Sequence, residues 1–323
     1  MPPRLQLSGL EDRFVPATAD VSLRSLLGST QTDVGDNEVS VADLGSNRLA
    51  IGGASGVVRI VDRGTQKELA RLVPYGEAFT GGVRVAAGDI TGDGVADLVT
   101  APGAGGGPRI RAFDGVTFAP VADFFAYSTD FRGGVTIAVG DVNGDGLADI
   151  ITGAGPGGGP HVRVFDGRTR EVIRETFAFD SSFTGGVNVA AGDLDRDGRA
   201  EVVVAAGAGG GPRVRVFAGS NFSPLADFFA TDPTWRGGVN VAVGDVTGRG
   251  RPSIVASANS TVAVFDGQAG APLQSFDSGE PGVRVFVGDF TGDGVADLGT
   301  TSSRTTSLRV FGANLVESNR LVI

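Results

Sequence analysis

Cysteine is absent from this chain of 323 residues, and histidine, methionine and tryptophan occur once each. Without cysteine there is no disulfide bond, no thiol nucleophile and no cysteine-ligated zinc. The single histidine, His161, excludes a histidine cluster for a transition metal and argues against a serine–histidine–aspartate triad. No apolar run approaches the roughly 18–20 residues of a membrane-spanning helix.

Basic residues are also scarce, because 27 Lys and Arg stand against 37 Asp and Glu, a net charge of −10. Binding to a phosphate backbone depends on clustered Lys and Arg, so nucleic acid is excluded as a partner. The hydrophobic content of 41% is sufficient for a core and argues against disorder over most of the chain. Of the functional groups that could form a site, carboxylate and carbonyl oxygens are the ones that remain.

The chain is built from internal repeats. The segment 81–115 recurs as 133–167 and 185–219, and weaker copies occupy 39–64, 237–267 and 281–313. One aspartate anchors each copy, at spacings of 46, 52, 52, 52 and 44 residues: Asp43, Asp89, Asp141, Asp193, Asp245 and Asp289. Periods of this length are typical of solenoids and propellers.

Each repeat contains four short segments with the pattern of β-strands. In the second repeat, residues 83–87 and 109–113 alternate in polarity, residues 122–126 are aromatic, and β-branched runs and Gly or Asp-Gly turns lie between such segments. No segment has a helical period with caps. The sequence therefore predicts an all-β protein with a single β-propeller over residues 36–323, of six four-stranded blades, with seven blades as the alternative.

Four repeats contain a loop with oxygen-bearing side chains at positions 1, 3, 5 and 9 and glycine at position 6. This spacing suits calcium, to which position 7 would add a backbone carbonyl. The predicted metal ligands, loop by loop, are Asp89, Thr91, Asp93, Val95 and Asp97; Asp141, Asn143, Asp145, Leu147 and Asp149; Asp193, Asp195, Asp197, Arg199 and Glu201; and Asp289, Thr291, Asp293, Val295 and Asp297. We expect about four calcium ions. The alternative is an ordinary Asp-Gly turn with solvated carboxylates.

The remaining two loops depart from this pattern. In the fifth repeat Arg249 stands at position 5, where its guanidinium would act as an internal counter-ion for Asp245. In the first repeat Asp43 is followed by Gly45, Asn47 and Ile51, which supply too little charge for a metal.

Taken together, these elements resemble the FG-GAP repeat of the integrin alpha-type propeller and the related bacterial VCBS repeats. The resemblance rests on Phe-x-Gly-Gly-Val before the loop, with Phe79, Phe131 and Phe183, and on Ala-Pro-Gly or Gly-Ala-Gly-Pro after it, as in Ala101–Gly103 and Gly153–Pro156. It covers about residues 39–313. It implies calcium in the loop between the first two strands of a blade, and adhesion or ligand recognition as the role.

Consecutive strands of a blade run in opposite directions, so alternate connections lie on opposite faces of the propeller. The aspartate loops and the loops between third and fourth strands share one face. The other carries Gly-Gly-Gly-Pro loops and five basic residues that form a candidate ligand surface: Arg109, Arg132, His161, Arg213 and Arg236. Backbone N–H groups of such loops can approach a ligand, whereas the alternative is that these glycines only permit tight turns.

Residues 1–35 are expected to be a disordered leader or export segment. They lack the apolar core of a secretory signal, but 10–17 resemble a short leader of bacterial surface proteins. We therefore expect a secreted or cell-surface monomer that meets a protein or glycan surface and does not insert into a membrane.

Three functions are compatible with this sequence. The preferred one is a non-catalytic recognition or adhesion module stabilised by calcium. The second is a glycan-binding lectin, and the third is an enzyme such as a polysaccharide lyase, which would need a base and a cation cluster in one cleft. The carboxylates outside the aspartate loops are scattered along the chain, which disfavours the enzyme.

Overall fold

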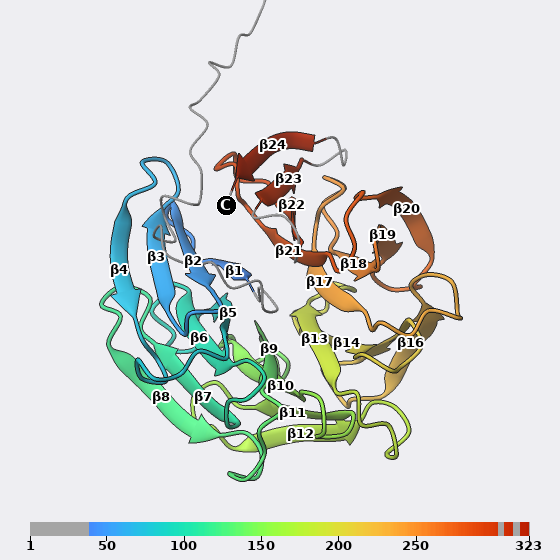
Figure 1. Ribbon diagram of the computed structural model, residues 1–323, viewed down its shortest axis with the longest axis horizontal. Helices are drawn as coiled ribbons and strands as arrows, with labels where there is room; N and C mark the ends of the chain where they lie inside the picture. Colours follow the sequence, from blue (N-terminus) through green and yellow to red (C-terminus); the bar gives the residue numbers. More distant parts are fainter. Residues whose placement is uncertain (1–38, 303–306, 313–316, 323) are drawn as a thin grey trace, which may run out of the picture.

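The computed structural model describes residues 39–302, 307–312 and 317–322, and these form an all-β ring (Figure 1). Its strands make up six four-stranded antiparallel sheets, each of four strands consecutive in the chain. The expected six-bladed propeller is thus confirmed. The proposed leader at residues 1–35 lies outside the described residues.

The blades follow one another around the ring in chain order (Figure 1). The strands are β1 (Ser40–Asp43), β2 (Arg48–Gly52), β3 (Val58–Asp62) and β4 (Glu68–Leu72); β5 (Val83–Gly88), β6 (Asp97–Pro102), β7 (Arg109–Phe113) and β8 (Pro120–Phe125); β9 (Val135–Gly140), β10 (Asp149–Ala154), β11 (His161–Phe165) and β12 (Val172–Phe177); β13 (Val187–Gly192), β14 (Glu201–Ala206), β15 (Arg213–Phe217) and β16 (Pro224–Phe229); β17 (Asn240–Gly244), β18 (Ser253–Ala258), β19 (Thr261–Asp266) and β20 (Pro272–Asp277); and β21 (Arg284–Gly288), β22 (Asp297–Thr301), β23 (Ser307–Phe311) and β24 (Glu317–Val322).

Burial changes in a regular way across each blade. The second strands β6, β10, β14 and β18 are buried at every position, because neighbouring blades cover both of their faces. The outermost strands alternate between exposed and partly buried residues, as in β8 and β16. The core therefore consists of the layers between adjacent blades; one such layer holds Val99, Ile110, Ile150 and Phe165 from blades two and three.

A register shift recurs near the end of every third strand. In blade three it lies between Val164 and Phe165, and the other five blades show it at the equivalent place. Such β-bulges increase the local twist of a strand pair. The outermost strand of each blade is thus twisted by a β-bulge at the same place.

The ring closes between blade six and blade one without an exchange of strands. β24 pairs with β23 of its own blade. Across the seam, Val41 and Val61 of blade one pack with Phe290 and Val310 of blade six. Side-chain packing and polar contacts, described below, therefore join the two ends of the described chain.

Candidate functional site

The aspartate at position 1 organises each predicted metal loop. In blade three, Asp141 accepts hydrogen bonds from the backbone N–H of Gly144 at 2.6 Å and of Gly146 at 2.8 Å. Asp89 and Asp289 hold the equivalent glycines in the same way. The position-6 glycines have φ between 83° and 86° in all four loops, a conformation that disfavours other residues. The loop is therefore tight, with its side chains turned toward its centre.

The carboxylate at position 9 starts the second strand and is buried in every one of these loops: Asp97, Asp149, Glu201 and Asp297. Asp149 accepts N–H hydrogen bonds from Val142, Asn143 and Gly167. Burial nevertheless raises the pKa of Asp149 to about 6, and burial also raises the pKa of Glu201 and of Asp297. A bound cation would offset this cost of ionisation, because a nearby positive charge favours the carboxylate.

Carboxylates converge most closely in blade four. Oxygens of Asp193, Asp195 and Asp197 lie within 4.8 Å of one another, a geometry that fits one metal ion. In blade three the positive end of the Asn143 amide lies among three carboxylates, with its nitrogen 3.3 Å from Asp145, 3.5 Å from Asp149 and 3.2 Å from Asp166. Such a point, surrounded by negative oxygens, suits a hard cation.

Asp166 was missed by the sequence analysis. It lies after β11, in the loop between the third and fourth strands, and one of its oxygens is held by the N–H groups of Arg168 and Thr169. Its other oxygen faces the Asn143 amide. The Phe-Asp-Gly motif that recurs after the third strands of blades two, three and five was the available signal.

The residues predicted at position 7 make a hydrogen bond within their own loop, and Arg199 also connects two blades. Each donates its backbone N–H to the position-5 aspartate, as Leu147 does to Asp145 at 2.9 Å. Arg199 of blade four reaches the loop of blade three and donates to the backbone oxygen of Asn143. Arg199 thus fixes the loops of blades three and four against each other. The predicted role of position 7 as a carbonyl ligand stays a prediction.

In blade five, Arg249 does not have the counter-ion role that the sequence predicted for it. Among the described residues, no ion pair joins Arg249 to Asp245. The carboxylate of Asp245 instead accepts the N–H groups of Thr247, Arg249 and Gly250 and the Thr247 hydroxyl, while the Arg249 side chain is exposed. The predicted counter-ion was wrong because this carboxylate is already satisfied by its own turn.

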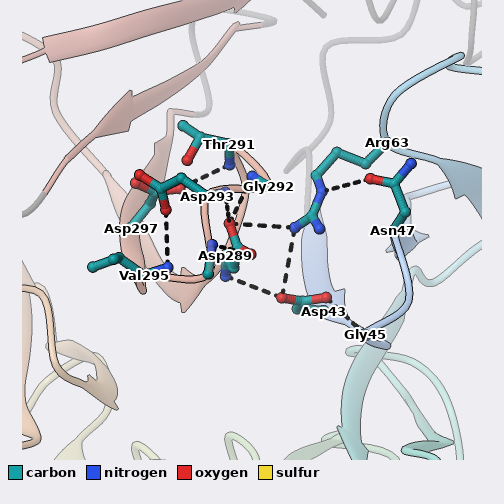
Figure 2. A network of polar contacts seen from close by, with 11 residues as sticks. Asp43, Gly45, Asn47, Arg63, Asp289, Thr291, Gly292, Asp293, Val295 and Asp297 are labelled. Atoms are coloured by element: carbon teal, nitrogen blue, oxygen red, sulfur yellow. Dashed lines mark hydrogen bonds and ion pairs between the residues drawn. The ribbon is translucent and has the colours of Figure 1, made fainter.

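An arginine does act as a counter-ion at the seam between blades six and one (Figure 2). The Nη1 atom of Arg63 lies 3.5 Å from Asp289 and 3.9 Å from Asp43, and Nε donates to the Asn47 side chain at 3.2 Å. Asp43 also accepts the backbone N–H of Asp289 at 3.0 Å. Asp43 also accepts the backbone N–H of Gly45 in its own turn at 2.8 Å, so it both holds that turn and links the blades.

On the opposite face, the five basic residues of the candidate ligand surface all contact groups of the protein. Arg109 and Arg213 form bidentate ion pairs with Asp123 and Asp227, with N–O distances of 2.6 Å. His161 lies 3.3 Å from Glu175. Burial is the main reason that the pKa of His161 is lowered, with a further contribution from Arg163.

Arg132 and Arg236 order the loops that carry them. Arg132 donates to the backbone oxygens of Thr129 and Phe131, and Arg236 donates to those of Pro233 and Trp235. Their own carbonyls accept the N–H groups of Gly105 and Gly209. The backbone N–H of the first glycine in each Gly-Gly-Gly-Pro loop is thus hydrogen-bonded to the loop that leads into the next blade.

Three exposed phenylalanines lie beside Arg109, His161 and Arg213 on consecutive blades. Phe125, Phe177 and Phe229 are 52%, 53% and 51% exposed and end the outermost strands β8, β12 and β16. They pair across the sheet with Arg109, His161 and Arg213, respectively. His161 stacks on Phe177 with ring centroids 4.7 Å apart. We call Phe125, Phe177 and Phe229 the phenylalanine row.

Comparison with known families supports the resemblance seen in the sequence. A model described as an FG-GAP-like repeat matches residues 89–152 and 193–256. Each match begins at a position-1 aspartate and ends in the second strand of the following blade, so it spans two aspartate loops. A search of curated proteins found no match.

Within the described residues, no helix has the length and apolar character needed to cross a membrane. The fold supports a module of the recognition or adhesion type. With its two matches to the repeat model and its six four-stranded blades, the chain is a β-propeller that contains FG-GAP-like repeats.

Proposed function

We propose that this protein is a calcium-stabilised, non-catalytic recognition module of the cell exterior. The observation that carries the calcium assignment is the convergence of Asp193, Asp195 and Asp197 in a loop whose position-9 residue, Glu201, is a buried acid. The same loop framework recurs in blades two, three and six. Bound calcium would supply positive charge to these carboxylates and tie the first strand of a blade to the second.

Calcium bound only by the folded state stabilises it by RT ln(1 + [Ca²⁺]/Kd). For a Kd of about 10⁻⁴–10⁻³ M, each site contributes roughly 0.4–1.4 kcal/mol at about millimolar calcium. Four independent sites would then contribute roughly 2–6 kcal/mol, which is comparable with the net stability of a domain. We therefore expect removal of calcium to lower the melting temperature strongly.

The experiment combines metal analysis with thermal unfolding. After desalting from calcium buffer, the wild-type chain should retain about four ions, and Asp195→Asn should retain one fewer. Arg249→Gln, in the metal-free loop of blade five, is the matched control and should leave the count unchanged. A melting curve that is the same with calcium and with chelator would refute the assignment.

Recognition is best supported on the outer surface of blades two to four. The phenylalanine row presents half-exposed rings at a regular interval, each next to a polar pair that contains a carboxylate. Aromatic and arginine side chains are enriched at contact surfaces, where rigid rings bury area with little loss of entropy. A protein or glycan surface that spans several blades would contact all three rings.

A glycan ligand is the second candidate, favoured by the combination of an exposed ring with polar groups in each of three equivalent places. Binding to a glycan array, with calcium and with chelator, distinguishes a lectin from a module that binds protein. Phe177→Ala should abolish binding to the array, while Val172→Ala, an exposed apolar residue on the same strand, should not. Turnover of a polysaccharide would favour the lyase instead.

Secretion is the proposed location, in keeping with the resemblance of residues 10–17 to a leader. Fractionation of the native host tests it. Protein retained in the cytoplasm would contradict this part of the proposal. The calcium assignment would not be affected, because it is tested separately.

A further inference from the structure

An exposed aromatic ring and a guanidinium meet at the third glycine of the Gly-Gly-Gly-Pro loop of blade four. A Cβ atom at Gly211 would lie 3.8 Å from Cε1 of Phe229 and 3.9 Å from Nη1 of Arg236. Phe229 ends the outermost strand of the same blade, and Arg236 belongs to the loop that leads into blade five. We call Gly211, Phe229 and Arg236 the Gly211 site.

Neither backbone conformation nor packing requires glycine at position 211. Its φ lies outside the left-handed region, and both contacts of an added Cβ would be at ordinary van der Waals distance. Gly159, the equivalent residue of blade three, has a φ of 72° and does favour glycine. Glycine loses more conformational freedom on folding than other residues, so it is destabilising where the backbone does not need it. At position 211, glycine keeps the surface between the ring and the guanidinium open to a ligand.

The Arg236 guanidinium is anchored along one side. Its Nη1 donates to the backbone oxygens of Pro233 at 2.6 Å and Trp235 at 2.8 Å, while Nε and Nη2 make no hydrogen bond or ion pair within the part of the chain that the structure describes. Asp232, the acid of the same loop, instead accepts the N–H and the hydroxyl of Thr234. Because the Arg236 side chain is exposed, an edge with two N–H donors is available to a ligand.

Phe229 supplies an apolar face beside this edge. The ring is 51% exposed, and Arg213, its partner on the adjacent strand, is neutralised by the bidentate pair with Asp227. The backbone N–H of Gly211 makes no hydrogen bond to another described residue. The site thus combines a planar cationic edge, a backbone donor and an aromatic face.

We propose that the Gly211 site binds a uronic acid unit of an acidic glycan. The carboxylate of such a sugar matches the two parallel donors of a guanidinium edge. The C–H groups on one face of the sugar ring would contact the negative face of Phe229. A glutamate side chain offers the carboxylate without this flat face, so a sugar is preferred over an acidic peptide. The site would then serve the glycan candidate of the proposed function, on which this assignment rests.

Trp235, the single tryptophan of the chain, is a local reporter, because its backbone oxygen accepts a hydrogen bond from Arg236. The full chain is titrated with glucuronate at fixed calcium, and binding is followed by tryptophan fluorescence and by calorimetry. Glucuronate should bind saturably, whereas glucose and N-acetylglutamate should not. A hyaluronan tetrasaccharide, which contains the same unit, should bind at least as tightly as the monosaccharide.

Two variants test the site from opposite sides. Arg236→Gln should weaken glucuronate binding about tenfold or more, because it removes a charge-assisted contact. Gly211→Val keeps the arginine but fills the space beside Phe229, so it should block binding while the melting curve shows a folded chain. Arg249→Gln, an exposed arginine in the aspartate loop of blade five, is the matched control and should bind as the wild type does.

Four results would overturn the proposal: no response to glucuronate by either measurement, an equal response to glucose, unchanged affinity in Gly211→Val, or a response to the monosaccharide without one to the tetrasaccharide. Equal binding of N-acetylglutamate would point to an acidic peptide instead. Binding of neutral glycans on the array, with no response to glucuronate, would reject the Gly211 site and leave the proposed function standing. The calcium count does not involve this site.

Discussion

At the scale of single residues, the buried acids make stability depend on pH in a direction opposite to ordinary acid denaturation. The pKa of Asp149 is 3.8 when unperturbed and about 6 in the metal-free fold. This difference corresponds to about 3 kcal/mol against ionisation in the folded state. The folded state therefore holds a proton that the unfolded state has lost between these two values. The stability contributed by this group should rise as pH falls through 6 and reach its full value below 3.8.

We expect the metal-free wild type to gain about 1 kcal/mol relative to Asp149→Asn when the pH is lowered from 7.5 to 5. The comparison with the variant cancels other groups, such as His161, whose lowered pKa acts in the opposite direction. Calcium needs the ionised carboxylate, so calcium affinity should instead fall below pH 6. Urea denaturation at the two pH values measures the effect. Parallel pH profiles for the two proteins would show that Asp149 does not titrate in this range.

Position 167 requires glycine because the backbone of Ala148 lies too close to leave room for a side chain. A Cβ atom at this position would lie 2.0 Å from the carbonyl oxygen of Ala148, and the N–H of Gly167 donates to buried Asp149. Gly167→Ala must displace the loop and break that hydrogen bond, so we expect a loss of about 2–4 kcal/mol by denaturation. Gly107→Ala is the control, because its nearest new contact would be 3.9 Å away. Similar losses in the two variants would contradict this reading.

At the scale of elements, the sequence predicted most strands because comparison of the repeats shows where each segment begins and ends. The third strand predicted at 109–113 matches β7. The second strand of blade three, β10, begins at Asp149, two residues after Leu147. Leu147 is apolar because its side chain packs against Gly92 in the loop of blade two. Contacts between blades give no period along a single strand, and the sequence pattern therefore did not predict this packing of Leu147.

The candidate site shows the same limit. Ligands within one loop could be read from their spacing, since chain connectivity alone brings positions 1, 3, 5 and 9 together. Asp166 lies 17 residues beyond Asp149 and reaches the loop only through the pairing of β10 with β11. Arg63 reaches Asp289 across almost the whole chain, through closure of the ring. Contacts of this kind depend on tertiary structure. The recurring Phe-Asp-Gly motif marked Asp166 but not the loop that it reaches, and Arg63 had no local signal.

The loop of blade five gives a prediction about one element. Because the Asp245 carboxylate accepts three backbone N–H groups of its own turn, Asp245→Ala should destabilise the chain by about 1–3 kcal/mol, with calcium or without it. Arg249 is exposed and has no ion pair among the described residues, so Arg249→Ala should change stability by less than about 0.5 kcal/mol. Thermal unfolding of both variants tests the contrast. Equal losses would restore the role of Arg249 as a counter-ion.

At the scale of the whole molecule, a ring must hold its ends together, and here the ends do not share a sheet. Each blade is complete in itself, so the seam between blades six and one depends on apolar packing around Phe290 and on the polar cluster at Arg63 (Figure 2). Arg63 takes the place of the glycine found in blades two to five, such as Gly115 and Gly167. The seam thus uses a charged residue where the other blades leave no space for a side chain.

Arg63→Gln should consequently weaken closure of the whole ring. Side chains of Arg63, Asp43 and Asp289 are 13%, 21% and 23% exposed, so removal of the guanidinium leaves two mostly buried carboxylates facing each other. We expect a loss of about 2–4 kcal/mol in chelator. The loss should be smaller in calcium, because an ion in the loop of blade six would neutralise Asp289. Denaturation under both conditions, with Arg249→Gln as control, measures this difference. A loss no greater than that of the control would show that packing around Phe290 alone closes the ring.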